Sequence, residues 1–191
     1  MGKQLQAGDL DRKVQVLAFS ETAPGVWDWT PQATSWARAE SPGRTQIFAP
    51  HARSGRGLSL TMRQHPSRIR GGMLQLGGQY LYIAEIFPLP EHPGYAELRT
   101  AQVELTACRA NLDREVPGPS FPAILTEEYT GHEQLEPLAV VTTDLMLVVP
   151  KEIYLAPGSW LEAGTEIYQV LEPHELDPVV NEYRLRRKED C

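Results

Sequence analysis

The sequence predicts a mainly β fold: a small antiparallel β-barrel or sandwich, present as two related β units in tandem. Three observations support this prediction. The 191 residues include 16 prolines and 15 glycines, which divide the chain into short segments and leave little room for long helices. Most of these segments alternate polar and apolar residues with the period of a half-buried strand. A pattern of glycine, leucine and tyrosine residues also occurs twice.

The two occurrences of this pattern lie at residues 71–83 and 157–169. Self-similarity at a fixed offset is the sequence signature of repeated units. An offset of 86 positions superposes three identical pairs, namely Gly72 with Gly158, Gly78 with Gly164, and Tyr82 with Tyr168. Because few identities are involved, chance coincidence remains the alternative to a true duplication.

Alternating patterns in the first half predict a series of strands, at residues 13–19, 26–29, 34–40, 58–63, 73–76, 80–86 and 95–105. Gly77-Gly78 is a preferred hairpin dipeptide, so residues 73–76 and 80–86 are expected to pair. Prolines and glycines punctuate residues 41–57, which are expected to form a long loop with room for a short helix at 46–52.

The second half repeats this order after a segment rich in proline. Residues 111–122 predict a linker between a first unit at 1–110 and a second, acidic unit at 123–191. The strands expected in the second unit lie at residues 123–126, 138–149, 166–171 and 183–186. No counterpart of the strand at 13–19 is evident, and a long strand over 95–108 that serves both units would account for this.

Charge is distributed unevenly, although the net charge is −7. Residues 1–100 hold 11 basic against 8 acidic residues (+3), and residues 101–191 hold 7 against 17 (−10). Residues 40–70 contain one acid, Glu40, and the arginines Arg44, Arg53, Arg56, Arg63, Arg68 and Arg70. This stretch predicts contact with a polyanion, and a solvated loop is the alternative.

No pattern of nucleophile, base or metal ligand is found in the chain. None of the five histidines has a second histidine or a cysteine at ligand spacing, and residues 132–136 have glutamate where a zincin motif needs its second histidine. The sequence therefore predicts no enzyme, no cofactor and no metal site. Cys108 and Cys191 are predicted to be free thiols, with Cys108 buried on a strand. The sequence lacks the long apolar run of a membrane span and the apolar region of a secretory signal.

The four tryptophans divide into two predicted roles. Trp36 and Trp160 are expected to lie in the core, because each occupies the apolar phase of a strand. Trp27 and Trp29 share one face of a short strand and predict an aromatic protein interface.

The order of segments in the first ~105 residues resembles the phage head–tail joining family, the head-closure or stopper proteins of tailed bacteriophages. The segments that carry the resemblance are AGDLDRKVQV at 7–16, TSWARAESPGR at 34–44, LSLTMR at 58–63, MLQLGGQYLYI at 73–83 and the strand at 95–105. TSWARAE is similar to the family's W-A-x-[VI]-x-P segment. Members of the family are typically one small domain, so residues 106–191 resemble a diverged second copy.

The resemblance implies a structural β-barrel protein of the virion neck, assembled in the host cytoplasm and without a membrane. It would form a ring that closes the DNA-filled head, with the portal or adaptor protein above, and a tail terminator or tail tube protein below. The loop that carries Arg44, Arg53 and Arg56 would line a channel and contact packaged DNA without sequence preference. The resemblance also implies a twelvefold portal and a sixfold tail, so a hexamer of two-unit chains is favoured over a dodecamer.

Two alternatives stay open. The chain could be a tail terminator or another ring protein of the tail or neck, because such proteins share similar barrels. It could instead be a cytosolic β-barrel module that binds an acidic polymer or a small ligand.

Overall fold

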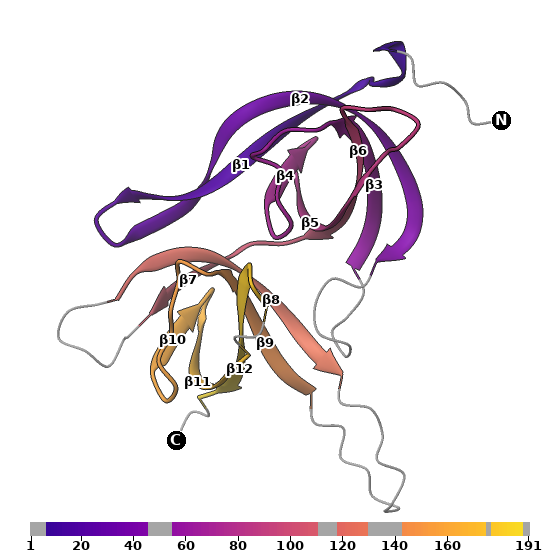
Figure 1. Ribbon diagram of the computed structural model, residues 1–191. Coiled ribbons are helices and arrows are strands. Elements are labelled where there is room, and N and C mark those ends of the chain that lie inside the picture. The colour runs from indigo at the N-terminus through magenta and orange to yellow at the C-terminus, as the bar shows by residue number, and fades with distance from the viewer. Residues whose placement is uncertain (1–6, 46–54, 111–117, 130–142, 175–176, 189–191) are drawn as a thin grey trace, which may run out of the picture. The chain divides into compact units, whose positions relative to one another are not determined.

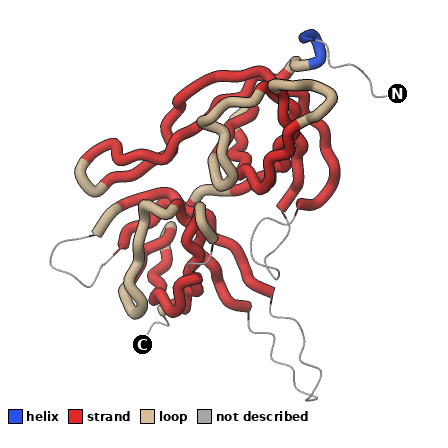
Figure 2. The backbone as a smooth tube through the Cα atoms, viewed as in Figure 1, coloured by secondary structure: helices blue, strands red, loops and turns tan. Residues whose placement is uncertain are grey.

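The computed structural model describes residues 7–45, 55–110, 118–129, 143–174 and 177–188 (Figure 1). Apart from a 3-10 turn at Ala7–Asp9, the regular elements of this part are β-strands (Figure 2). No helix in these ranges is long and apolar enough to cross a membrane. The chain divides into two compact units, and each is a closed ring of six strands, so the predicted mainly β fold with two related units is confirmed.

The first unit comprises residues 1–19, 29–47 and 54–103. Its ring runs β1-β4-β5-β6-β3-β2, and a pairing between β1 and β2 closes it. The bounds are β1 (Arg12–Ala23), β2 (Val26–Thr45), β3 (Gly55–Arg63), β4 (Met73–Leu76), β5 (Gln79–Pro88) and β6 (Tyr95–Val103).

The second unit comprises residues 20–28, 48–53 and 104–191. Its ring runs β8-β7-β10-β11-β12-β9, and a pairing between β8 and β9 closes it. The bounds are β7 (Thr106–Ala110), β8 (Ser120–Tyr129), β9 (Thr143–Pro150), β10 (Trp160–Ala163), β11 (Glu166–His174) and β12 (Val180–Arg187). The tip of the β1–β2 hairpin groups with this unit, where the Ser120 N–H donates to the Gly25 carbonyl at 2.8 Å.

The two rings have the same topology. Adding six to each strand number of the first ring gives the ring order of the second. A register shift also recurs at the same place, after Ile83 in the β5–β6 pair and after Val170 in the β11–β12 pair. β-bulges are specific local features and not incidental irregularities, so their recurrence supports the relation between the two units.

The ladders correct the predicted offset from 86 to 87 positions over β3 to β5. Met73 pairs with Tyr82 at the start of the β4–β5 ladder, and Trp160 pairs with Gln169 at the start of the β10–β11 ladder. These two pairs are equivalent, so Leu74 aligns with Leu161. The left-handed glycines agree, because Gly71 (φ 80°) then aligns with Gly158 (φ 82°). A slip of one residue moves every side chain to the other face of a strand, so the sequence offset mixed inward and outward positions.

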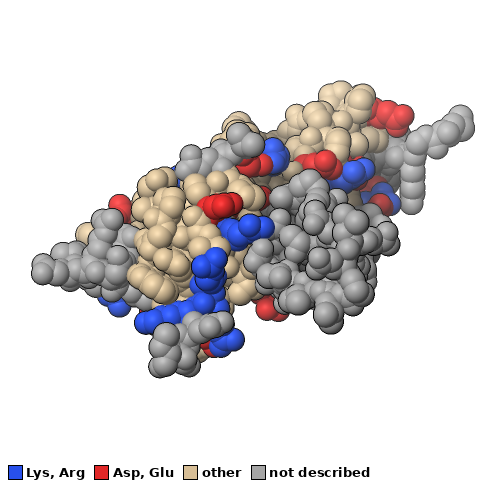
Figure 3. All heavy atoms as spheres, turned by 90° about the horizontal axis from the view of Figure 1, so that it is seen from below, with Lys and Arg blue, Asp and Glu red and all other residues tan. Residues whose placement is uncertain are grey.

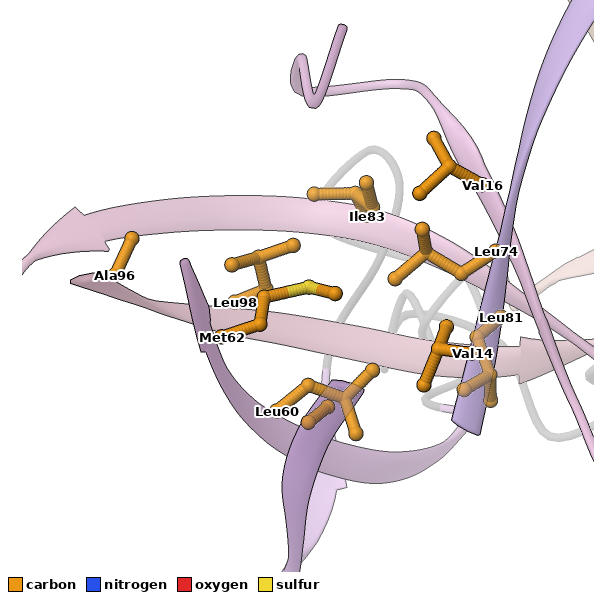
Figure 4. Close-up of a cluster of buried hydrophobic side chains, with 10 residues drawn as sticks. Val14, Val16, Leu60, Met62, Leu74, Leu81, Ile83, Ala96 and Leu98 are labelled. Atoms are coloured by element: carbon orange, nitrogen blue, oxygen red, sulfur yellow. The ribbon is translucent and has the colours of Figure 1, made fainter. Parts of the chain in front are cut away.

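Aliphatic side chains fill the first ring (Figure 4). The core residues are Val14, Val16, Ala37, Leu60, Met62, Leu74, Leu81, Ile83, Ala96 and Leu98. The strand pairings within each ring show which positions are equivalent. The equivalents of these ten residues in the second ring are Cys108, Ala110, Ala123, Leu147, Val149, Leu161, Tyr168, Val170, Asn181 and Tyr183. All ten counterparts are buried as well. Side chains fill the interiors of such small barrels.

Two predicted boundaries were wrong. The strand expected at 95–105 ends at Val103, and its suggested continuation to 108 belongs to a separate strand, β7. The second ring therefore has its own counterpart of β1, and it begins before the expected linker at 111–122. The loop expected at 41–57 is shorter, because β2 continues to Thr45 and β3 begins at Gly55. A register shift between Glu40 and Gly43 accommodates Pro42, which has no N–H to donate. The helix expected at 46–52 lies outside the described residues.

Candidate functional site

The structure brings two of the three predicted channel arginines together. Arg44 on β2 and Arg56 on β3 are directly opposite one another in the antiparallel ladder. Their strands lead into residues 46–54, and Arg53 lies outside the described residues. Two basic residues therefore occupy facing positions at the ends of adjacent strands.

The predicted aromatic interface is partly buried. Trp27 and Trp29 are both half-buried, and the Trp29 ring packs against Phe19 with centroids 5.1 Å apart. The exposed aromatic residue of β2 is Trp36, which is 54% exposed although the sequence placed it in the core. Its neighbour Ala37 fills the core instead. Trp160 likewise lies on the outward phase of β10, with the Lys188 amine 5.4 Å from its ring centroid.

A cavity of about 360 Å³ opens in the first unit beside the segment that joins β3 to β4. Its lining includes Arg63, His65, Pro66, Arg68, Ile86 and Leu98. The cavity combines cationic groups with aliphatic walls. Sites that bind small groups commonly have this composition, because apolar walls exclude water and a few polar groups fix the orientation.

Arg68 is the unusual member of this lining. Its Nη2 donates to the Ser35 hydroxyl at 2.8 Å, whereas its Nε and Nη1 are buried with no hydrogen-bond partner. Burial lowers the pKa of Arg68, because desolvation penalises the charged guanidinium. A buried unpaired donor on a cation is costly. Because Arg68 lines the cavity, a turn of its side chain toward an anion there would supply the missing acceptors.

A second cavity of about 430 Å³ shares Arg63 with the first and is also lined by Ser35, Trp36 and Tyr95. The Arg63 guanidinium lies 6.0 Å from the centroid of the Tyr95 ring. The two cavities together place cationic groups beside an exposed indole. We call this pair of cavities the Arg68 pocket.

The position equivalent to Arg68 in the second unit is a buried leucine. The segments 64–72 and 151–159 have equal length, and their last turns match, because Gly72 N–H donates to Ile69 O and Ser159 N–H donates to Ala156 O. Their first turns differ, since Arg68 N–H donates to His65 O whereas Ile153 N–H donates to Pro150 O. The 87-residue offset therefore aligns Arg68 with Leu155, which is 1% exposed. An aliphatic residue is thus compatible with this place in the fold, and the arginine is specific to the first unit.

Sequence reasoning identified Arg68 only as one of several arginines. Nothing in the local pattern marks residues 64–72 as different from the rest of the basic stretch. Alignment of the two halves at an offset of 87 would have singled out Arg68, since it aligns this arginine with a leucine.

Cys108 is buried on β7, as predicted, and its Sγ donates to the Thr106 carbonyl at 3.4 Å. Burial raises the pKa of this thiol to about 12. Cys191 lies outside the described residues. Within the described ranges, no three histidine, cysteine or acidic residues are grouped so as to hold a metal ion.

We expect Cys108 to resist alkylation in the folded protein. Near pH 8 the thiolate fraction of a thiol with this pKa is about a thousandfold below that of an ordinary cysteine, and the thiolate is the reactive form. Iodoacetamide labelling followed by mass spectrometry of the Cys108 peptide, with and without urea, measures the difference. Equal labelling rates in both conditions would contradict the burial of this residue.

The comparisons with known proteins returned no relative. No protein-family model matches the chain, no curated protein matches it, and no solved structure matches it.

Proposed function

We propose that this chain is a structural protein of a phage virion neck, which forms a ring that closes the DNA-filled head and joins it to the tail. The observation that carries the proposal is the tandem pair of closed six-stranded units with one topology. A ring subunit needs surfaces that pair with its neighbours and no catalytic group. The segment order of the first unit, which resembles the head–tail joining family, gives the proposal its specific form.

The facing arginines Arg44 and Arg56 support a contact with packaged DNA. Phosphate contacts from arginine are independent of sequence and weaken with salt, as a channel that passes all DNA requires. On the face drawn in Figure 3, several Lys and Arg side chains lie close together at the lower left, and others lie apart from them beside acidic side chains. Within the second unit, basic residues occur in and just after β12, at Arg184, Arg186, Arg187 and Lys188.

Cryo-electron microscopy of particles from a lysate that lacks this gene tests the proposal. We expect filled heads without tails, or heads that have lost their DNA. Heads that retain DNA beside separate tails of irregular length would place the chain at the tail terminator instead. Complete infectious particles would rule out a neck role and favour the cytosolic binding module.

The stoichiometry is a separate part of the proposal. Six two-unit chains present twelve related barrels, which would match a twelvefold portal above and a sixfold tail below. Native mass spectrometry of the assembled ring should therefore give six chains. A ring of twelve chains would contradict this arrangement.

Reversal of the channel charge is expected to impair DNA retention. We expect Arg44→Glu combined with Arg56→Glu to lower the titre of infectious particles by about tenfold or more, because phosphate contacts would become repulsive. Arg12→Glu is the matched control, since Arg12 is an exposed arginine beside Asp11 on β1. Equal titres for the two variants would remove DNA contact from the proposed role of these residues.

A further inference from the structure

The Arg68 pocket has the features of a receptor for a carboxylate. It holds a guanidinium with two buried nitrogens that lack a hydrogen-bond partner, and the second unit has leucine at the equivalent position. Guanidinium and carboxylate form strong charge-assisted hydrogen bonds. Trp36, 54% exposed at the adjoining cavity, offers an apolar surface next to this cation. The pocket therefore fits a ligand that carries an acid beside an apolar or aromatic group.

The second unit displays such a pair of side chains. Tyr154, between β9 and β10, is 64% exposed, which makes it more exposed than Trp36. Glu152, two residues earlier on the same segment, is also exposed. Burial of Ile153 and Leu155, each 1% exposed, fixes this segment against the core and presents Glu152 and Tyr154 outward.

Hydrogen bonds hold this segment in place. The Tyr183 hydroxyl accepts from the Leu155 N–H at 3.1 Å, and Asn181 Nδ2 donates to the Ile153 carbonyl at 3.0 Å. A segment that is already ordered loses little conformational entropy when it binds. Its exposed aromatic residue is thus suited to act as an anchor for a protein contact.

We propose that the Arg68 pocket of one copy binds the Glu152–Tyr154 segment of a second copy of this chain. The Glu152 carboxylate supplies acceptors for Arg68, and Tyr154 packs against Trp36. The opposite charges of the two parts of the chain, +3 for residues 1–100 and −10 for residues 101–191, favour this pairing. Because the contact joins two different surfaces, repetition generates a ring or a filament. The inference rests on the proposed ring only in requiring that copies of the chain associate.

Sedimentation velocity of the full chain tests the association. We expect wild type to self-associate at low salt, and Arg68→Leu and Glu152→Gln each to weaken association about tenfold, as the loss of one charge-assisted contact would. Arg12→Leu, which removes one exposed positive charge outside the pocket, should associate like wild type. Wild type that stays monomeric, or pocket variants that associate as wild type does, would overturn the proposal.

The melting temperature of Arg68→Leu separates a binding role from a structural one. Leucine occupies the equivalent place in the second unit, so this substitution should keep or raise the melting temperature while association falls. A lower melting temperature would mean that Arg68 serves the fold of its own unit, and would count against the proposal. Glu152→Gln tests the contact independently of any effect on the fold. An isosteric change at this exposed position should leave the melting temperature unchanged while association falls.

Cross-linking identifies the occupant. In the Arg68→Lys variant, a carbodiimide couples the substituted amine to a carboxylate in contact with it. Mixing ¹⁴N- and ¹⁵N-labelled chains before coupling distinguishes links between copies from links within one copy. We expect hybrid-isotope products at Glu152. Links to other acids only, links within a single copy only, or no links would each overturn the proposal.

The outcomes for this pocket and for the neck proposal are independent. Tailless particles on deletion of the gene, together with normal association of Arg68→Leu, would remove the pocket contact and keep the neck role. Infectious particles on deletion, together with links to Glu152, would keep the contact and remove the neck role.

Discussion

Leu74→Ala is expected to destabilise the first unit by about 3–5 kcal/mol, and Leu161→Ala should destabilise the second by a similar amount. Both side chains are 0% exposed, and the ladders place them at equivalent positions on β4 and β10. Each substitution removes most of a buried side chain and leaves a cavity in a closed ring. Neighbouring strands cannot collapse into this cavity without breaking ladder hydrogen bonds, so the effect should lie at the high end for such changes.

Hydrogen exchange measured peptide by peptide should localise the damage. Because each ring closes on itself, Leu74→Ala is expected to speed exchange in β1–β6, and Leu161→Ala in β7–β12. Arg12→Ala is the control, since this side chain is 63% exposed and its removal should change stability by less than about 0.5 kcal/mol. A uniform loss of protection along the chain after either core substitution would show that the two rings unfold as one cooperative unit.

The fold class could be predicted because strand periodicity and turn chemistry are local. The expected turn at Gly77-Gly78 lies between β4 and β5, and both glycines have positive φ, which few other residues adopt without strain. The strand at 80–86 was found because aromatic and β-branched residues suit a half-buried pleated surface. Such signals depend on neighbours in sequence and survive without knowledge of the rest of the fold.

The register of the repeat could not be predicted from identities alone. The identical pair Tyr82 and Tyr168 favoured an offset of 86, yet the ladders align Tyr168 with Leu81. Both tyrosines are buried, so their burial does not select between the two offsets. The neighbouring position does, because an offset of 86 would align the exposed Ile167 with the buried Leu81. Inward and outward positions alternate along a strand, and only the sum of many positions fixes the register.

The outward position of Trp36 was missed for a related reason. Alternation in residues 34–40 was recognised, but small alanines and not the large tryptophan occupy the inward phase of β2 there. A closed six-stranded ring leaves little interior volume, so small residues on some strands must offset large ones on others. Size as well as polarity decides which phase faces inward, and that choice depends on strands distant in sequence.

Tyr183→Ala is expected to be as damaging as the two leucine substitutions, at about 3–5 kcal/mol. The side chain is 0% exposed in β12, where the first unit has Leu98. Its hydroxyl accepts from the Leu155 N–H at 3.1 Å and donates to the Ile153 carbonyl at 3.4 Å. The residue therefore both fills the second ring and ties the segment 151–159 to it.

Tyr183→Phe separates these two roles. It keeps the ring and deletes the hydroxyl, which leaves the Leu155 N–H buried without its acceptor, and a buried unsatisfied group costs about 1–3 kcal/mol. Urea unfolding should show this loss, and exchange of the Leu155 amide should accelerate more than that of β9 or β11. Tyr154→Phe, the same change on an exposed side chain, is the matched control. An unchanged Leu155 amide in Tyr183→Phe would mean that Ile153 and Leu155 hold this segment by apolar packing alone.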